Sequence, residues 1–288
     1  MIQSMTGYAQ IQRDTPHGSL ALELRSVNSR FIDLAFRVAE DLRTLEPAFR
    51  ELIGARIARG KVDIRLSYQL PAFAAAETSV DRAIVTRLAQ LTAAVRRDFP
   101  EVQPMRVSEV LNWPGVMGDR GDLFEGLRAH GIPMMREAID ELVATRLREG
   151  AKLTEMISSR TAQIRARLVT LAPAIPAAIS AYQERLAQKL RDVLSSADED
   201  RIRQEIAVFG VKIDVAEEFT RLGAHLDEVD RALKAGGAVG KRLDFLMQEL
   251  NREVNTLGSK SVSKEISEAV IEFKLAIEQM REQVQNLE

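Results

Sequence analysis

The chain contains no cysteine. Disulfides, zinc–thiolate sites, iron–sulfur clusters and thiol nucleophiles are therefore excluded. Histidine is scarce, and His17, His130 and His225 share no HExxH or similar metal-ligand spacing. Oxygen ligands remain, so a hard divalent cation such as Mg²⁺ or Mn²⁺ is the metal class that this composition favours.

An excess of charge of one sign is also missing. Forty Lys and Arg residues against forty-two Asp and Glu residues give a formal net charge of −2, so a polyanion would have to bind to a local patch. The N-terminal run MIQSMTGYAQ lacks the basic segment and apolar stretch of a signal peptide, and no later stretch has the roughly 20 apolar residues of a membrane span. We therefore expect a cytoplasmic protein without a membrane partner.

Hydrophobic periodicity predicts an α+β fold. Alternation of apolar and polar residues predicts strands at 20–24, 32–38 and 62–68, with a helix between the second and the third. From Val80 onward the pattern is mainly helical. We expect a small N-terminal mixed α/β-sheet domain, then long helices, and an all-α C-terminal domain with a heptad-patterned final helix. The predicted ranges are 1–155 for the α+β domain, 156–204 for a connecting helical region and 205–288 for the C-terminal domain.

The final helix carries an apolar seam with spacings that alternate between four and three residues. This spacing is typical of the a and d positions of a coiled coil. Two interpretations stay open, which are packing within the same subunit and self-association. The seam comprises Ile266, Val270, Phe273, Ile277, Met280, Val284 and Leu287.

Two helical segments near the C-terminus have narrow polar rows beside their apolar arcs. The first row contains Asp214, Glu218, Arg221 and His225, with Glu217 beside it. The second begins at Lys241 and contains Asp244, Gln248, Arg252 and Asn255. Asp and Asn are unfavourable residues within an exposed helix, because their side chains compete for backbone hydrogen bonds. An exposed helix stabilised by i,i+3 and i,i+4 ion pairs also explains the first row, and taken alone this explanation is the commoner one.

A short glycine-rich turn at 236–240 separates the two segments, so they are expected to pack antiparallel. If the rows converge, their carboxylates can hold a divalent cation and their cations can bind phosphate. The candidate metal ligands are Asp214, Glu217, Glu218, Asp244 and Glu249. The candidate catalytic residues are His225, as general acid or base, with Glu218, Asp244 and Glu249. The candidate phosphate-binding residues are Arg221, Lys241, Arg242, Arg252 and Lys260.

A further candidate RNA contact lies between two predicted strands. The run 25–31, RSVNSRF, offers two guanidinium groups at Arg25 and Arg30 and the aromatic ring of Phe31. This combination suits contacts to an RNA backbone with base stacking. The alternative is a turn with solvated arginines and a core phenylalanine, which is commoner.

Eleven short strings distributed over the whole chain resemble those of the YicC/YloC family of bacterial proteins. They are 1–8 (MIQSMTGY), 25–30 (RSVNSR), 45–47 (LEP), 59–62 (RGKV), 113–116 (WPGV), 239–245 (VGKRLDF), 248–249 (QE), 251–253 (NRE), 255–256 (NT), 259–261 (SKS) and 277–286 (IEQMREQVQN).

The resemblance implies a metal-dependent endoribonuclease of the bacterial cytoplasm that cuts single-stranded or structured RNA. It also implies an N-terminal YicC-like domain, a C-terminal helical domain and assembly into ring-shaped homo-oligomers, with hexamers expected. The cofactor expected is Mn²⁺ or Mg²⁺. The rival hypothesis is an oligomeric RNA-binding adaptor without chemistry of its own, in which the carboxylates serve only as ion-pair partners.

Overall fold

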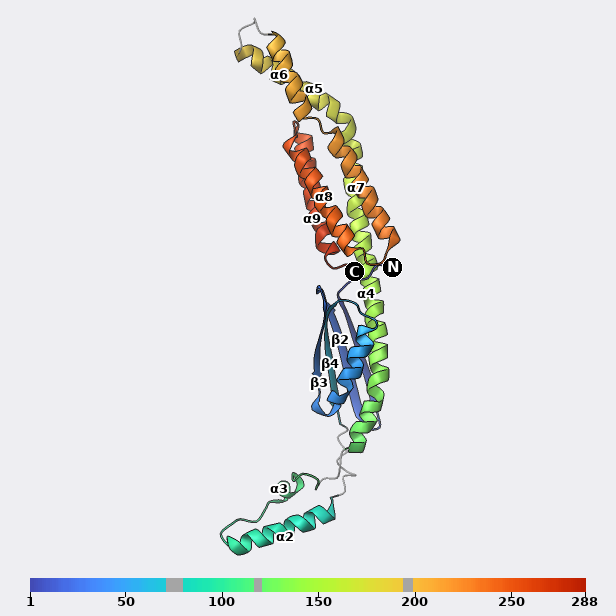
Figure 1. Cartoon of the computed structure of the whole chain (residues 1–288), viewed down its shortest axis with the longest axis vertical. Coiled ribbons are helices and arrows are strands. Elements are labelled where there is room, and N and C mark those ends of the chain that lie inside the picture. Colours follow the sequence, from blue (N-terminus) through green and yellow to red (C-terminus); the bar gives the residue numbers. More distant parts are fainter. Residues whose placement is uncertain (71–79, 117–120, 194–198) are drawn as a thin grey trace. The chain divides into compact units, whose positions relative to one another are not determined.

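The computed structural model describes residues 1–70, 80–116, 121–193 and 199–288 (Figure 1). The chain forms two compact units, which are unit 1, with Met1–Gly7 and Val143–Glu288, and unit 2, with Tyr8–Leu142. The helix α4 (Gly121–Leu171) contributes residues to both units. These units follow spatial contacts, so the sequence ranges 1–155, 156–204 and 205–288 stay a prediction.

Unit 2 is built on a four-stranded mixed sheet in the order β1-β2-β4-β3. The strand β2 runs antiparallel to β4, whereas β3 runs parallel to it. Neighbouring parallel strands need a crossover connection, which here contains the 3₁₀ helix η1 and the helix α1. The expected α+β class is confirmed. The bounds are β1 (Gly7–Thr15), β2 (Gly18–Val27), β3 (Ile32–Val38), η1 (Glu40–Leu45), α1 (Glu46–Gly54) and β4 (Gly60–Gln69).

One face of this sheet is apolar, as the alternating pattern requires. Leu22 of β2 lies opposite Leu66 of β4, and both are buried. Phe49 and Ile53 of α1 are buried as well. Unit 2 also contains α2 (Arg82–Asp98), capped by Asp81, and α3 (Val107–Leu111).

Unit 1 is helical. The helices α7, α8 and α9 lie side by side with the C-terminal part of α4 (Figure 1). Their apolar arcs form one core in which Leu222, Leu226, Leu243, Leu250 and Phe273 are buried. After α4 the elements are η2 (Ala172–Ala174), α5 (Ile175–Val193), α6 (Glu199–Lys212), α7 (Ala216–Ala235), α8 (Gly240–Ser259) and α9 (Lys264–Val284).

The turn between α7 and α8 depends on glycine. Gly236 and Gly237 have φ angles of 69° and 78°, in the left-handed region that other residues adopt only with strain. The two glycines reverse the chain immediately after α7. The predicted antiparallel hairpin of α7 and α8 is therefore present.

The apolar seam of the last helix is internal. All seven seam residues, from Ile266 to Leu287, are buried in the core of their own unit. The interpretation of this seam as a self-association surface was wrong, because α4, α7 and α8 already supply the apolar surface that it needs. Ile271 and Leu275, on the opposite side of α9, are exposed.

The two ends of the chain meet in unit 1. Ser4 forms an antiparallel bridge with Leu287, and the amide of Met5 donates to the carbonyl of Asn286 at 2.7 Å. The buried guanidinium of Arg146 in α4 donates to the carbonyl of Ser4 at 2.6 Å and pairs with Glu288. Residues at the start and at the end of the chain, Ser4 and Glu288, therefore both contact α4.

By length and composition alone, one described helical run passes the test for a membrane span. This run is Leu123–Asp192, whose most apolar window has a mean hydropathy of 1.2. The expectation that the protein has no membrane partner stays a prediction.

Candidate functional site

Two buried carboxylates on neighbouring helices mark the candidate site. Glu218 of α7 and Glu253 of α8 are only 5% and 4% exposed. A buried charge is costly unless it is paired and hydrogen-bonded. The partners of these two side chains therefore decide what the site can do.

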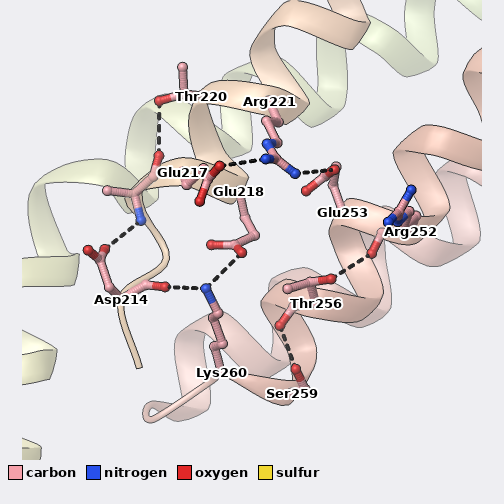
Figure 2. Close-up of polar contacts among 11 residues, drawn as sticks. Asp214, Glu217, Glu218, Thr220, Arg221, Arg252, Glu253, Thr256, Ser259 and Lys260 are labelled. Atoms are coloured by element: carbon pink, nitrogen blue, oxygen red, sulfur yellow. Dashed lines mark hydrogen bonds and ion pairs between the residues drawn. The ribbon is translucent and has the colours of Figure 1, made fainter. Parts of the chain in front are cut away.

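Lys260 supplies the partner of Glu218. Its Nζ donates to Oε1 of Glu218 at 2.8 Å and to the backbone carbonyl of Asp214 at 2.9 Å (Figure 2). Lys260 directly follows α8 and Asp214 shortly precedes α7. The antiparallel hairpin brings these two helix ends together.

Arg221 contacts both the buried carboxylate of Glu253 and the exposed carboxylate of Glu217. Its Nη2 donates to Oε1 of Glu217 at 2.5 Å and its Nη1 to Oε1 of Glu253 at 3.5 Å. The carboxylate of Glu217, and next that of Glu253, raise the pKa of the Arg221 guanidinium above its ordinary value. Arg221 is therefore a permanent cation at the surface of the site.

We refer to Asp214, Glu217, Glu218, Arg221, Glu253 and Lys260 as the base cluster. It contains four carboxylates and two cationic side chains, so its formal charge is −2. One buried oxygen in it, Oε2 of Glu218, has no hydrogen-bond partner among the described residues. Buried polar atoms are nearly always hydrogen-bonded, so an orphan of this kind indicates a place for a ligand, an ion or water.

The structure brings together five of the predicted site residues, which are Asp214, Glu217, Glu218, Arg221 and Lys260. The structure does not bring Asp244 to these five residues. Its Oδ2 accepts from Gln248 at 2.9 Å, and its Oδ1 lies 3.9 Å from Nε of Arg281. Asp244 is close to the opposite end of the hairpin and faces α9 because its position on α8 is rotated away from α7.

Arg242 also lies at the opposite end of the hairpin. It pairs with Glu228 of α7, whose other oxygen pairs with Arg231 at 2.8 Å. Arg242 is therefore engaged by a carboxylate of its own chain. Its predicted role in phosphate binding stays a prediction.

The predicted metal-ligand set is not assembled within one chain. Over the described ranges, no three His, Asp or Glu side chains lie close enough to hold a metal ion by themselves. His225 and Glu249 are half-buried, and Lys241 and Arg252 are exposed. Within the part of the chain that the structure describes, these four side chains make no hydrogen bond or ion pair, and their roles stay predictions.

Sequence reasoning missed Glu253, although a signal was present. Glu253 lies three residues after Leu250 and four before Leu257, which places it on the apolar arc of α8. Glu218 lies on the arc of α7 in the same way, between Val215 and Leu222. A carboxylate at an apolar position of a helix is therefore the signal that selects both buried groups.

A second polar feature belongs to unit 2. Phe31 is 69% exposed, so the interpretation as a core phenylalanine was wrong. The guanidinium carbon of Arg30 lies 5.2 Å from the centroid of its ring, and Arg25 is exposed on β2. An exposed ring beside a guanidinium group can stack on a base.

Comparisons with known proteins agree over the whole chain. The family model described as Endoribonuclease YicC-like, N-terminal region, matches residues 2–155, and the model described as Endoribonuclease YicC-like, C-terminal, matches residues 171–288. A protein of Haemophilus influenzae named Probable endoribonuclease YicC is 36% identical over 288 residues, covering all of both chains. A protein of the same name from Clostridioides difficile is 26% identical over 296 residues, again covering all of both chains. The chain therefore belongs to the YicC-like endoribonuclease family.

Proposed function

We propose that this protein is a metal-dependent endoribonuclease that cleaves RNA phosphodiester bonds in bacterial RNA turnover, with the base cluster as its active site. The single observation that carries the proposal is the match of both halves of the chain to an endoribonuclease family. The base cluster supports the location, because it combines buried carboxylates with an exposed arginine.

The donor set of the base cluster fits a hard divalent cation. Oε2 of Glu218 is buried without a partner, and the carbonyl oxygen of Asp214 lies beside the same Lys260 ammonium as Oε1 of Glu218. Carboxylate and carbonyl oxygens suit Mg²⁺ and Mn²⁺. Glu218 and the carbonyl of Asp214 would hold the ion. When bound, such a cation supplies Lewis-acid stabilisation of negative charge on phosphate oxygens.

The remaining residues of this region bind and orient the RNA. Arg221, which is exposed and fully charged, would contact a phosphate, with Arg252 on the neighbouring helix and Lys241 farther along it. His225 lies one turn after Arg221 on α7 and is half-buried. As general acid or base, its imidazole would exchange a proton with the RNA.

In unit 2, Arg25, Arg30 and Phe31 would position single-stranded RNA. The exposed ring of Phe31 stacks on an unpaired base while the guanidinium groups contact the backbone. Assembly into a homo-oligomer, with a hexamer expected, and a cytoplasmic location complete the proposal.

The first test compares the two ends of the α7–α8 hairpin. Highly purified wild-type protein, Glu218→Gln and Asp244→Asn are incubated with a labelled structured RNA and Mn²⁺ or Mg²⁺, with EDTA as a control. We expect Glu218→Gln to lower the cleavage rate by about 100-fold or more, because loss of even an outer-shell partner of a metal ligand commonly costs about 10- to 100-fold. Asp244→Asn should stay within about threefold of wild type. Equal cleavage rates for wild type and Glu218→Gln would refute the location of the active site at the base cluster.

The adaptor hypothesis makes a different prediction for the same experiment. An adaptor binds RNA, and its affinity falls as salt rises, but no product sensitive to EDTA forms. RNA binding without cleavage in all three proteins would therefore favour the adaptor over the nuclease.

The role of Phe31 is tested by RNA affinity. Phe31→Ala should weaken binding of a single-stranded RNA by about 1–3 kcal/mol, the usual contribution of one stacked base. Phe99→Ala is the matched control, because Phe99 is also an exposed phenylalanine of unit 2. Equal affinities of the two variants, measured by fluorescence anisotropy at fixed salt, would remove Phe31 from the binding surface.

A further inference from the structure

The ammonium of Lys260 occupies the position in the base cluster that suits a cation. It is bound by a carboxylate oxygen of Glu218 and by the carbonyl oxygen of Asp214, which are the oxygen types that also coordinate Mg²⁺ and Mn²⁺. Figure 2 shows the Glu218 side chain pointing toward Lys260. The contacts that stabilise this ammonium are therefore contacts that a divalent cation would need.

We propose that Lys260 is an internal counter-cation that competes with a divalent metal ion for the base cluster, so that metal binding releases its ammonium. The choice of ligand rests on the proposed function, whereas the competition rests on the geometry of Glu218, Asp214 and Lys260.

The charge of the base cluster favours a divalent cation over the Lys260 ammonium. With Lys260 and Arg221 in place the formal charge is still −2, and Glu218 keeps one buried oxygen without a partner. Without the Lys260 ammonium the formal charge is −3, and a divalent ion in its place lowers this charge to −1 and engages the free oxygen. The monovalent ammonium leaves a charge of −2 and an unpaired oxygen, so the metal ion is the better partner once it is available.

Lys260 has a route out of the cluster. Its side chain is 25% exposed, whereas that of Glu218 is 6% exposed. A lysine side chain is flexible and its ammonium is strongly hydrated, so it can move to solvent while Glu218 stays in place. The released ammonium is then free to contact an RNA phosphate, which is the role that the sequence predicted for Lys260.

The opposite end of the hairpin does not offer the same arrangement. Glu228 has both oxygens paired, one with Arg242 and one with Arg231. Asp244 lies beside Gln248 and Arg281 and is only half-buried. A cation there would have to replace established partners without gaining a buried free oxygen.

The test measures Mn²⁺ binding to the full-length protein by electron paramagnetic resonance of the free ion. Lys260→Met removes the ammonium and keeps an unbranched side chain that is one atom shorter. In this variant the metal ion no longer competes with a charge-assisted hydrogen bond. We therefore expect the Kd of Lys260→Met for Mn²⁺ to be about 10- to 100-fold lower than that of wild type. Lys264→Met is the matched control, because Lys264 is exposed and pairs only with Glu268 in the described chain; its Kd should equal that of wild type. Equal or weaker Mn²⁺ binding by folded Lys260→Met would overturn the proposal.

A measurement on the wild-type protein covers the case in which Lys260→Met does not fold. Lysine acetylation by acetic anhydride is followed by mass spectrometry with and without saturating Mn²⁺. We expect labelling of Lys260 to rise several-fold with Mn²⁺ while labelling of Lys264 stays constant, because only Lys260 loses a buried partner. Unchanged labelling of Lys260 would overturn the proposal.

The outcome separates this inference from the nuclease proposal. If Lys260→Met binds Mn²⁺ more tightly but the wild type cuts no RNA, the competition is supported and the nuclease is refuted. If the wild type cuts RNA with Mn²⁺ but Lys260 affects neither Mn²⁺ affinity nor labelling, the competition is refuted and the nuclease stands.

Discussion

The two ends of the α7–α8 hairpin are both rich in charged residues but differ in burial. At the base cluster, the carboxylates of Glu218 and Glu253 are almost completely buried. At the turn end, the side chains of Glu228 and Arg242 are 24% and 56% exposed, although they also form an ion pair. Charge density along the sequence is therefore a poor guide to the site, whereas the burial of a carboxylate on the apolar arc is a better one.

The difference has an energetic meaning. An exposed ion pair gains little, because water screens the charges and ordering two long side chains is unfavourable. A buried carboxylate has already lost its water, so it depends on the partner that the fold supplies. The base cluster is stable only while cations compensate it, which makes it sensitive both to mutation and to added cations.

The largest expected effect is on stability, when the cationic side chain at one end of the hairpin or at the other is replaced. Lys260→Met should lower the free energy of unfolding by about 3 kcal/mol in EDTA, because it leaves the buried carboxylate of Glu218 without its charged partner. Arg242→Met should lower it by at most about 1 kcal/mol. Urea denaturation followed by circular dichroism measures both. If the two variants lose the same stability, burial does not distinguish the two ends.

A smaller effect concerns the salt dependence of the two ion pairs. Double-mutant cycles on Glu218–Lys260 and on Glu228–Arg242 give the coupling energy of each pair. Raising the salt from 0.1 to 1 M shortens the Debye length from about 10 Å to about 3 Å. We expect the coupling of the exposed pair, about 1 kcal/mol or less, to fall by roughly half, while that of the buried pair changes little. A parallel loss at both ends would contradict the comparison.

The smallest expected effect is at the start of α9, next to the base cluster in sequence but exposed. Hydrogen bonds from its own backbone amide and from the Ser263 side chain lower the pKa of Glu265 below its ordinary value of 4.5. A lowered folded-state pKa stabilises the protein above pH 4.5, and this contribution is lost as the pH falls through the folded-state value. Glu265→Gln should therefore lower Tm slightly at pH 7. The deficit should shrink as the pH falls below 4.5, and a deficit of constant size in thermal unfolding experiments would refute this origin.

Much of the fold could be predicted because it depends on periodicity. Alternating residues such as Leu20, Leu22 and Leu24 identified a strand with one buried face, and this face is buried in the structure. The seam of α9 was also found from its spacing. Its partner could not be found in that way, because a heptad pattern requires only an apolar surface and does not specify which chain supplies it.

The candidate site could be predicted only in part. The structure brings together four residues from the row on α7, which are Asp214, Glu217, Glu218 and Arg221. The row on α8 lies on a side of that helix that includes Asp244, which faces α9, and leaves out Glu253, which contacts Arg221 of α7. The helical wheel gives the relative angles of side chains, but it does not give the rotation of one helix against its neighbour.

The sequence by itself determined the secondary structure, the apolar arcs and the glycine-rich turn that makes α7 and α8 antiparallel, because these depend on residues close to one another in the chain. Only the tertiary structure decided that Lys260 meets Glu218, that Arg221 meets Glu253 and that Asp244 faces α9. The rotation and register of packed helices result from how the side chains of three helices interlock in one core. That interlocking is a property of the whole packed unit, and the pattern of a single helix does not contain it.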